Sequence, residues 1–290
     1  MDITISNGQL FVTIASLGAE LQRIYNVETK IDYLWSGDAQ FWGKKSPVLF
    51  PIVGGLKNNQ YSYQEKQYSL SRHGFARELS FQIANQSSSS VCFLLESTDE
   101  TKKLYPFDFH FYINYTIQQN KLIVEYHVHN KSSESMYFSV GAHPAFKVPI
   151  TDDTTFSDYV LHFNKVENCG IYPLSSEGLI EKESIPFFQH SNILPLKKEL
   201  FYKDALVFKE LQSNCISIKS PLHEHGLSVE YDDFPYMGIW SAKNADFICI
   251  EPWCGIADSV DTEGDISLKE GINQLLPNED FKRWWNVTLY

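Results

Sequence analysis

Residues 121–130 read "KLIVEYHVHN", and an apolar side chain stands at every second position, namely Leu122, Val124, Tyr126 and Val128. Successive side chains of a strand point to opposite faces, so this period of two is typical of a half-buried β-strand. The segment before it, "FYINYTI" (111–117), has the same period, and Gln119 and Asn120 lie between the two runs. The pair therefore predicts an antiparallel hairpin.

Strand-like runs recur along the whole chain: "LFVTIA" (10–15), "FQIA" (81–84), "VCFLLES" (91–97), "MYFSV" (136–140), "YVLHF" (159–163), "ALVFKEL" (205–211), "CISIKS" (215–220), "LSVEYDDF" (227–234) and "DFICIE" (246–251). Helical periodicity is nearly absent; we expect one short helical turn around residues 38–44 and a closing strand near the C-terminus. Parallel α/β folds need crossover helices, which are missing here. We expect an all-β fold, a large antiparallel β-sandwich, and, without any linker-like segment, a single domain over residues 1–290.

The composition argues against several classes of partner. There are 24 Lys and Arg against 36 Asp and Glu, a formal net charge of −12, and such a field repels phosphate backbones and anionic lipid. No run of about 18 apolar residues, the length of a membrane-spanning helix, occurs. The five cysteines have neither zinc-type nor CxxC spacing, so we expect them to be reduced thiols. We expect a cytoplasmic monomer or homodimer that binds a small molecule and neither nucleic acid nor membrane.

Two side chains that could do chemistry are placed in the same way. In "FICIEPWCG" (247–255), Glu251 follows an apolar run, and such a carboxylate costs several kcal/mol unless it is paired or needed as an acid or base. His143 in "VGAHPAF" (140–146) also follows an apolar run, and each of the two precedes a proline, which restricts its backbone to extended geometry. Strand alternation puts Glu251 on one face with Phe247 and Cys249, so it lies at the rim of an apolar layer. That arrangement suits a substrate cleft.

A structural explanation competes with a catalytic one at these positions. A single histidine in a strand is more often packed or solvated than catalytic. His127 with His129, and His223 with His225, form HxH pairs, but neither brings an obvious third ligand, so we expect no metal. The chain has no GxSxG, P-loop or GxGxxG element, and a serine hydrolase or a nucleotide-binding protein therefore has no support.

Three stretches occur in order along the chain: "RHGFAR" (72–77), "GAHPAF" (141–146) and "CIEPW" (249–253). Together they resemble the aldose 1-epimerase family, the galactose-mutarotase-like proteins. "SLGAEL" (16–21), "PVLFPIVGG" (47–55), "DALVF" (204–208) and "IWS" (239–241) resemble its LacX-type branch in particular. The resemblance covers nearly the whole chain, and it implies a β-super-sandwich fold, a sugar site on the concave face and an enzyme without a cofactor.

The resemblance also implies roles for individual residues. The catalytic glutamate, a general base, corresponds to Glu251, and the histidine that protonates the ring oxygen corresponds to His143. The second site histidine, which steadies the ring oxygen and neighbouring hydroxyls, corresponds to His73. A substrate-binding aspartate corresponds to Asp204, and an arginine that lines the pocket corresponds to Arg77.

One position departs from the family pattern. Many relatives have an arginine that touches sugar hydroxyls where this chain has Gly55, and the sequence leaves open whether Arg77 or Lys57 replaces it. The apolar face of a sugar also needs a partner, and Trp253 or Phe75 is a candidate for stacking on it, although core packing is the commoner role of a single aromatic residue.

Anomerising a pyranose requires removal of the O1 proton and protonation of the ring oxygen O5, so one base and one acid suffice. The resemblance therefore implies an aldose 1-epimerase acting on an aldohexose such as galactose or glucose. Alternatives are a hexose-6-phosphate 1-epimerase, a glycosidase that pairs Glu251 with Asp204, and a carbohydrate-binding or sensor protein without turnover. We expect a free hexose rather than a 6-phosphate, because an extended backbone turns Arg72 away from the face that Arg77 shares with His73.

Overall fold

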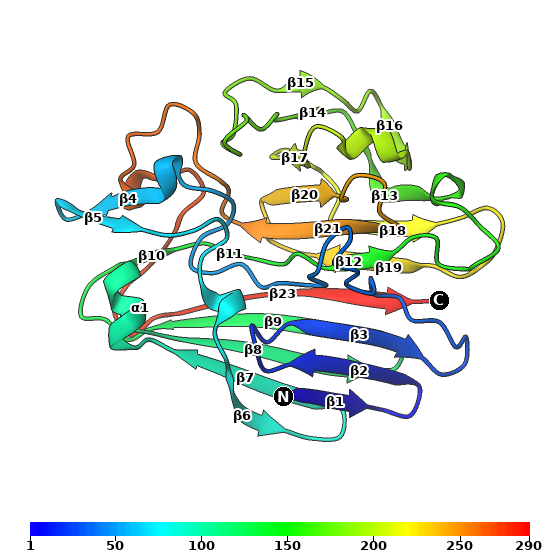
Figure 1. Cartoon of the computed structure of the whole chain (residues 1–290), viewed down its shortest axis with the longest axis horizontal. Helices are drawn as coiled ribbons and strands as arrows, with labels where there is room; N and C mark the ends of the chain where they lie inside the picture. Colours follow the sequence, from blue (N-terminus) through cyan, green and yellow to red (C-terminus); the bar gives the residue numbers. More distant parts are fainter.

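The predicted hairpin is part of the largest sheet (Figure 1). The computed structural model describes residues 1–290, and in it β8 (Phe109–Gln118) pairs antiparallel with β9 (Lys121–Asn130). The two-residue turn is confirmed, and its first residue, Gln119, has a φ of 54°. The apolar face of β9 is the core face, since its members are all buried: Leu122, Val124, Tyr126 and Val128.

Nine antiparallel strands form this sheet. In spatial order they are β16 (Ser191–Pro195), β13 (Val160–Glu167), β18 (Cys215–Lys219), β19 (Leu227–Tyr231), β23 (Asp280–Leu289), β9, β8, β7 (Ser90–Glu96) and β6 (Gln82–Gln86). The closing strand expected at the C-terminus is β23, which pairs with β9 on one side and β19 on the other. The end of the chain therefore joins the two halves of the sheet.

Two further sheets pack on the first. One consists of β11 (Val140–Gly141), β21 (Phe247–Cys254), β20 (Tyr236–Trp240) and β17 (Leu206–Phe208), with β12 (Ala145–Lys147) also paired to β21. The other consists of β1 (Asp2–Ser6), β2 (Leu10–Ala15) and β3 (Leu21–Asn26). Three small pairs complete the fold: β4 (Gln60–Tyr63) with β5 (Lys66–Ser69), β10 (Met136–Phe138) with β22 (Asn273–Leu275), and β14 (Gly170–Ile171) with β15 (Ile185–Pro186). The predicted all-β antiparallel class is confirmed.

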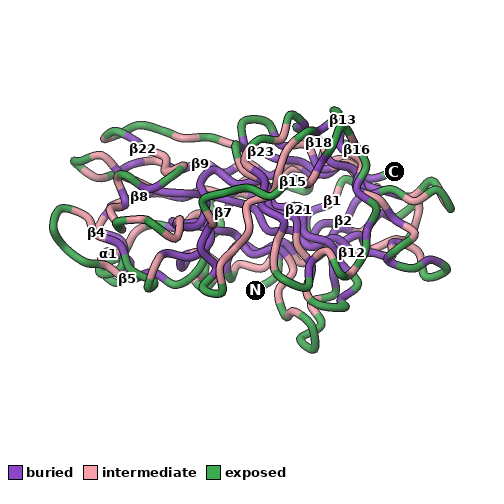
Figure 2. The backbone as a smooth tube through the Cα atoms, turned by 90° about the horizontal axis from the view of Figure 1, so that it is seen from above, coloured by how far each residue is buried: buried purple, intermediate pink, exposed green.

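One hydrophobic core joins the three larger sheets. It contains 66 buried residues, among them Val12 of β2, Phe111 of β8 and Ile250 of β21. Figure 2 shows the buried segments running through the middle of the molecule, with exposed segments around them. Strands β8 and β9 each give one face to this core, as period-two alternation requires. Because β21 packs Ile248 and Ile250 into the core, its other face is left for the loops that surround the site.

Helical structure is sparse, as expected, but differently placed. Residues 38–44 form a hydrogen-bonded turn in which Asp38 O accepts the N–H of Trp42 at 2.9 Å, rather than a helix. The single α-helix, α1 (Asp99–Leu104), was not predicted, although Thr98 caps it through the Thr101 N–H. Short 3₁₀ turns are η1 (Lys57–Asn59), η2 (Ala76–Glu78), η3 (Phe156–Asp158), η4 (Lys198–Phe201) and η5 (Ile266–Leu268). None of these helices has the length and apolar character that a membrane crossing requires.

A buried ion pair fastens the segment after β21. Lys269 Nζ and Asp258 Oδ1 lie 2.7 Å apart, and each side chain is only 3% exposed. We expect Lys269→Met to lower the free energy of unfolding by about 3–5 kcal/mol, because the Asp258 carboxylate then stays buried without its counter-ion. Urea unfolding measures the loss.

Lys182→Met is the matched control for that variant. Lys182 also pairs with an aspartate, Asp261, but its side chain is 65% exposed. Exposed pairs contribute little because water already solvates both charges, so this variant is expected to unfold close to wild type. Equal, small effects in the two variants would contradict the role given to the buried pair.

Candidate active site

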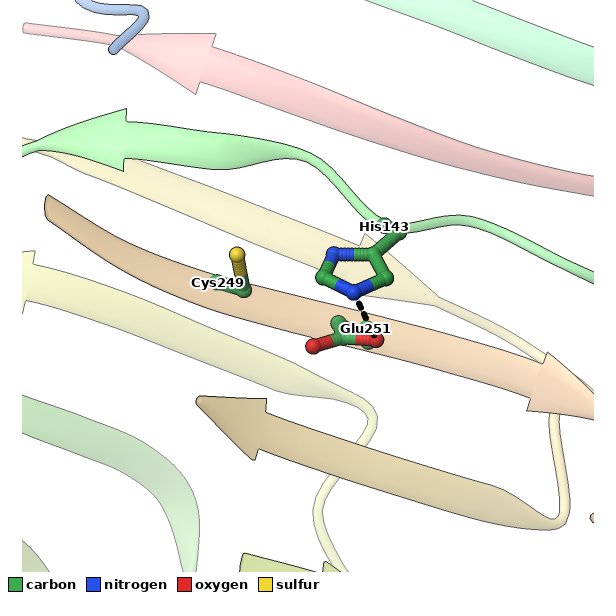
Figure 3. A group of neighbouring side chains, drawn as sticks. All are labelled: His143, Cys249 and Glu251. Atoms are coloured by element: carbon green, nitrogen blue, oxygen red, sulfur yellow. Dashed lines mark ion pairs between the residues drawn. The ribbon is translucent and has the colours of Figure 1, made fainter. Parts of the chain in front are cut away.

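Strand β21 brings the predicted carboxylate to an apolar face. Cys249 and Glu251 project to the same side of the strand (Figure 3), as alternation predicted. The strand does not end at Glu251, however, and continues to Cys254. Pairing on one edge is interrupted between Cys249 and Trp253, where β12 gives way to β11, and Pro252 lies within this gap. Glu251 is therefore held inside a strand rather than at its end, and its backbone is fixed from both directions.

His143 lies opposite Glu251 because of the same gap. It belongs to the short connection between β11 and β12, and both of these strands pair with β21. His143 Nε2 lies 3.4 Å from Glu251 Oε2, and the two side chains are 10% and 2% exposed (Figure 3). The structure thus brings together the two residues to which the resemblance assigns proton transfer.

Two tryptophans fix the imidazole of His143. The Trp42 ring stacks on it, with centroids 5.0 Å apart and an interplanar angle of 26°, and Trp240 meets it edge-on at 5.7 Å and 87°. His143 Nδ1 is buried and has no hydrogen-bond partner in the protein. The orientation that points Nε2 at Glu251 is therefore set by packing against aromatic rings.

Burial governs the protonation of this pair. It raises the pKa of Glu251 well above the usual 4.5; Arg72 opposes that rise and Asp204 adds to it. Burial also lowers the pKa of His143 to about 3, with Arg77 and Arg72 contributing in the same direction. Burial thus favours the neutral form of both groups, with the proton of the pair on the carboxyl. One proton shared by an adjacent acid and base is the minimum that anomerisation requires.

His73 presents a hydrogen-bond donor to the same space. Its Nδ1 accepts the backbone N–H of Gly54 at 3.1 Å, and the backbone N–H of His73 donates to Gly54 O at 2.8 Å. Burial lowers the pKa of His73 well below 6.5, with His143 the next cause. A neutral imidazole whose Nδ1 is an acceptor carries its proton on Nε2. His73 is therefore a neutral donor, its ring 5.7 Å from that of His143.

A cavity of about 510 Å³ opens onto these groups. Besides His73, His143 and Glu251, it is lined by three other predicted site residues, Asp204, Arg77 and Trp253. Asp204 is partly anchored, since its Oδ1 accepts the Ala205 N–H at 2.7 Å. A volume of this size holds a monosaccharide.

Of the two aromatic residues predicted to stack on a sugar, only Trp253 lines the cavity. Its indole lies against Gly238 of β20 and Gly141 of β11, where a Cβ would approach ring atoms to 2.3 and 2.7 Å. Both positions need glycine for that reason. Phe75 is 8% exposed and packs in the core against Phe50, with ring centroids 6.4 Å apart, so it does not reach the cavity.

The prediction that Arg72 points away from the site is wrong. His73 and Gly74 have φ values of 69° and 71°, and a 3₁₀ turn follows at Ala76–Glu78. The segment is therefore not extended, and strand alternation does not apply to it. Arg72 and Arg77 both line the cavity, and Arg77 Nη2 donates to the Arg72 carbonyl at 2.8 Å.

The space beside Gly55 is bordered by Arg72 rather than by Lys57. A Cβ at Gly55 would lie 3.8 Å from Gly178 O, and a Cβ at Gly178 would lie 2.9 Å from Arg72 Nη2. Lys57 is engaged elsewhere, because its Nζ donates to the Val260 carbonyl at 2.9 Å. Arg77 lines the cavity and Lys57 does not. Of these two candidates to replace the family arginine at Gly55, only Arg77 therefore lies at the site.

His143, Cys249 and Glu251 also place a nitrogen, a sulfur and an oxygen within 4.8 Å of one another. Such a set has the chemistry of a zinc ligand group. Burial raises the pKa of the Cys249 thiol well above 9.0, and Glu251 adds to the rise, whereas a metal would need the thiolate. Arg72 and Arg77 line the same cavity and oppose a further cation. Proton transfer is the use that these charges favour.

Several cavity residues were not predicted to belong to the site, among them Trp42, Arg72, Lys203, Trp240 and Lys243. Trp240 belongs to the quoted "IWS" stretch, which was a signal without an assigned role. The other four come from turns and loops, where no periodicity indicates which way a side chain points.

The stacked antiparallel sheets have the galactose mutarotase-like fold, and the His143–Glu251 pair lies in its cavity. The chain belongs to the aldose 1-epimerase family. The sequence model of that family, described as Aldose 1-epimerase, matches residues 1–275.

Full-length relatives agree with this assignment. Protein LacX of Lactococcus lactis subsp. lactis, in its plasmid form, is 32% identical over 298 residues, covering 100% of this chain and 99% of its own. A galactose mutarotase related enzyme from Lactobacillus acidophilus superposes with a TM-score of 0.95 at 36% identity, covering 100% and 97% of the two chains. A galactose mutarotase-like protein from Lactobacillus casei ATCC 334 gives 0.93 at 31% identity, covering 100% of both.

Proposed function

We propose that the protein is an aldose 1-epimerase that interconverts the α and β anomers of an aldohexose such as galactose or glucose. The observation that carries the proposal is the buried His143–Glu251 pair, 3.4 Å apart, at a cavity that His73 and Asp204 also line. Family membership supports the same reaction class.

In the proposed reaction, Glu251 takes the O1 proton while His143 protonates O5, and the C1–O5 bond breaks to give the open-chain aldehyde. Rotation about C1–C2 presents the other carbonyl face, and closure reverses the proton transfers. Each positioned group typically supplies about 10²–10⁴-fold, or roughly 3–5 kcal/mol.

The charges on the pair account for reversibility. Opening starts from carboxylate and imidazolium and ends with the neutral acid and the neutral imidazole. Burial favours that neutral form, whereas Arg72 beside Glu251 favours the carboxylate. An O1 hydroxyl that donates to Glu251 also favours the carboxylate, so sugar binding prepares the base. Burial on one side, and Arg72 with the O1 hydroxyl on the other, thus keep both the neutral acid and the carboxylate of Glu251 accessible.

Polarimetry on freshly dissolved α-glucose and α-galactose tests the activity. We expect the protein to speed the optical change without added metal or nucleotide, and to keep its activity after dialysis against a chelator. Loss of activity on dialysis that one divalent ion restores would contradict the cofactor-free mechanism. Binding of sugar without any acceleration would instead identify a carbohydrate-binding or sensor protein.

A further inference from the structure

We propose that the sugar substrate of this site carries an anionic group, a phosphate ester or a carboxylate, bound by Arg72 and Arg77 with Lys203 and Lys243 nearby. This inference rests on the proposed function and names its substrate class. It reverses the expectation of a neutral hexose, which depended on Arg72 pointing away from the site.

The side chains that line the cavity carry a positive net charge. Its lining includes four permanent cations, Arg72, Arg77, Lys203 and Lys243, against two carboxylates, Asp204 and Glu251. The cavity therefore has an excess of two positive charges even when both carboxylates are ionised. The chain as a whole carries a net charge of −12. A positive cavity in an acidic protein focuses an anion onto the site.

Most of these cations lack partners within the protein. The side chains of Arg72, Lys203 and Lys243 make no ion pair and no hydrogen bond within the protein, whereas eleven other cationic side chains do form ion pairs, such as Lys209 with Glu270 at 2.8 Å. Arg77 has a long contact of 3.7 Å with the exposed Glu78, and its Nε is buried without a hydrogen-bond partner. The side-chain donors of Arg72, Lys203 and Lys243 are therefore free for a ligand, whereas Arg77 already uses Nη2 in its hydrogen bond to the Arg72 carbonyl.

The four cations reach the cavity from two places in the fold. Arg72 and Arg77 come from one segment, in which Arg77 Nη2 donates to the backbone carbonyl of Arg72. The two lysines come from two loops that are tied by a 2.7 Å hydrogen bond from Tyr202 to Asn244, and Lys243 Nζ lies 5.3 Å above the Tyr202 ring. A guanidinium group offers planar, bidentate donors that phosphate and carboxylate oxygens accept, and lysines add point charges.

A rival explanation gives Arg72 a different task. Its charge lowers the pKa of Glu251 against the effect of burial, so Arg72 could serve only to keep the base ionised. That role would affect neutral and anionic sugars alike. Substrate binding by Arg72 would add a further loss that only the anionic sugar shows, and this difference decides between the two.

The test compares glucose, glucose 6-phosphate and glucuronate by NMR exchange spectroscopy, with the uncatalysed rates subtracted. At low ionic strength we expect kcat/KM to be at least about tenfold higher for one of the two anions than for glucose, and to fall as salt is added. Comparison of glucose 6-phosphate with glucuronate shows whether the site prefers a phosphate ester or a carboxylate. Equal values for all three sugars would overturn the proposal.

Arg72→Gln is the decisive variant, and Arg23→Gln is its control. Arg23 belongs to β3, pairs with Asp32 and lies away from the cavity, so its loss should leave every rate unchanged. Arg72→Gln should lower kcat/KM for the preferred anion at least about tenfold more than it lowers that for glucose, because the loss with glucose reports only the effect of Arg72 on Glu251. An equal loss for both sugars would assign Arg72 to Glu251 alone and overturn the proposal.

Calorimetry on Glu251→Gln keeps this inference separate from catalysis. We expect that variant to bind the preferred anionic sugar more tightly than glucose, and to lose the difference when Arg72→Gln is added. If no sugar is turned over by wild type but the anion is still preferred in binding, the proposed function fails and the inferred ligand class stands. Absence of any preference in binding overturns the inference whatever the activity.

Discussion

Glu251→Gln is expected to lower kcat for anomer interconversion by at least about 10²-fold while sugar binding survives. The amide keeps the shape of the side chain and its place in β21, but it cannot take the O1 proton. Because binding contacts remain, KM should change much less than kcat. Polarimetry or NMR exchange gives the rate, and calorimetry gives the affinity.

The same variant should not be destabilised at neutral pH. Burial raises the folded-state pKa of Glu251 well above 4.5. A raised pKa means that the carboxyl contributes its full stability below 4.5 and loses it as the pH rises through the folded-state pKa. The amide does not titrate, so the stability of Glu251→Gln relative to wild type should increase as the pH rises above 4.5, by at most about 1.4 kcal/mol for each pH unit.

Urea unfolding at acid and at mildly alkaline pH separates catalysis from folding. An unfolded variant would give Glu251 a structural role, and a folded variant with wild-type kcat would remove it from the mechanism. A relative stability that falls with rising pH would show that the carboxyl is ionised in the folded state, contrary to the effect of burial described above.

Regular alternation accounts for what the sequence predicted correctly. The period of two in β9 identified the buried face and the hairpin, and the same rule placed Cys249 and Glu251 on one side of β21. The rule holds because these backbones are extended and held by neighbouring strands, β9 by β8 and β23 and β21 by β20 without a break. The family motifs then indicated which charged residues to examine, and Asp204, Arg77 and Trp253 all reached the cavity with the two histidines.

The errors arose where the backbone leaves that regularity. Arg72 was wrongly excluded by alternation in a segment that turns at His73, and Phe75, the stacking candidate from the same segment, does not reach the cavity. The ion pair of Lys269 with Asp258 spans eleven residues and depends on how a loop folds back. Lys203 and Lys243 line one cavity only because two loops pack together. Local patterns carry no information on such tertiary contacts.

His143→Asn is expected to lower kcat by at least about 10²-fold, because the amide N–H is too weakly acidic to transfer a proton to O5. The glutamate partner remains, yet the base alone cannot open the ring when the leaving oxygen stays unprotonated. Trp42 and Trp240 pack around the imidazole, so the smaller side chain also leaves space between them. A positional change of the tryptophans must therefore be separated from the loss of the acid.

His143→Gln and tryptophan fluorescence provide that separation. Glutamine restores much of the volume beside Trp42 without supplying an acid, so it should be as inactive as asparagine while its emission spectrum stays closer to wild type. Recovery of activity in His143→Gln would show that His143 only positions its neighbours. Equal inactivity, with both proteins folded by urea titration, would leave proton donation as the function lost. A wild-type rate in both variants would transfer the acid role to His73, the other imidazole in the cavity.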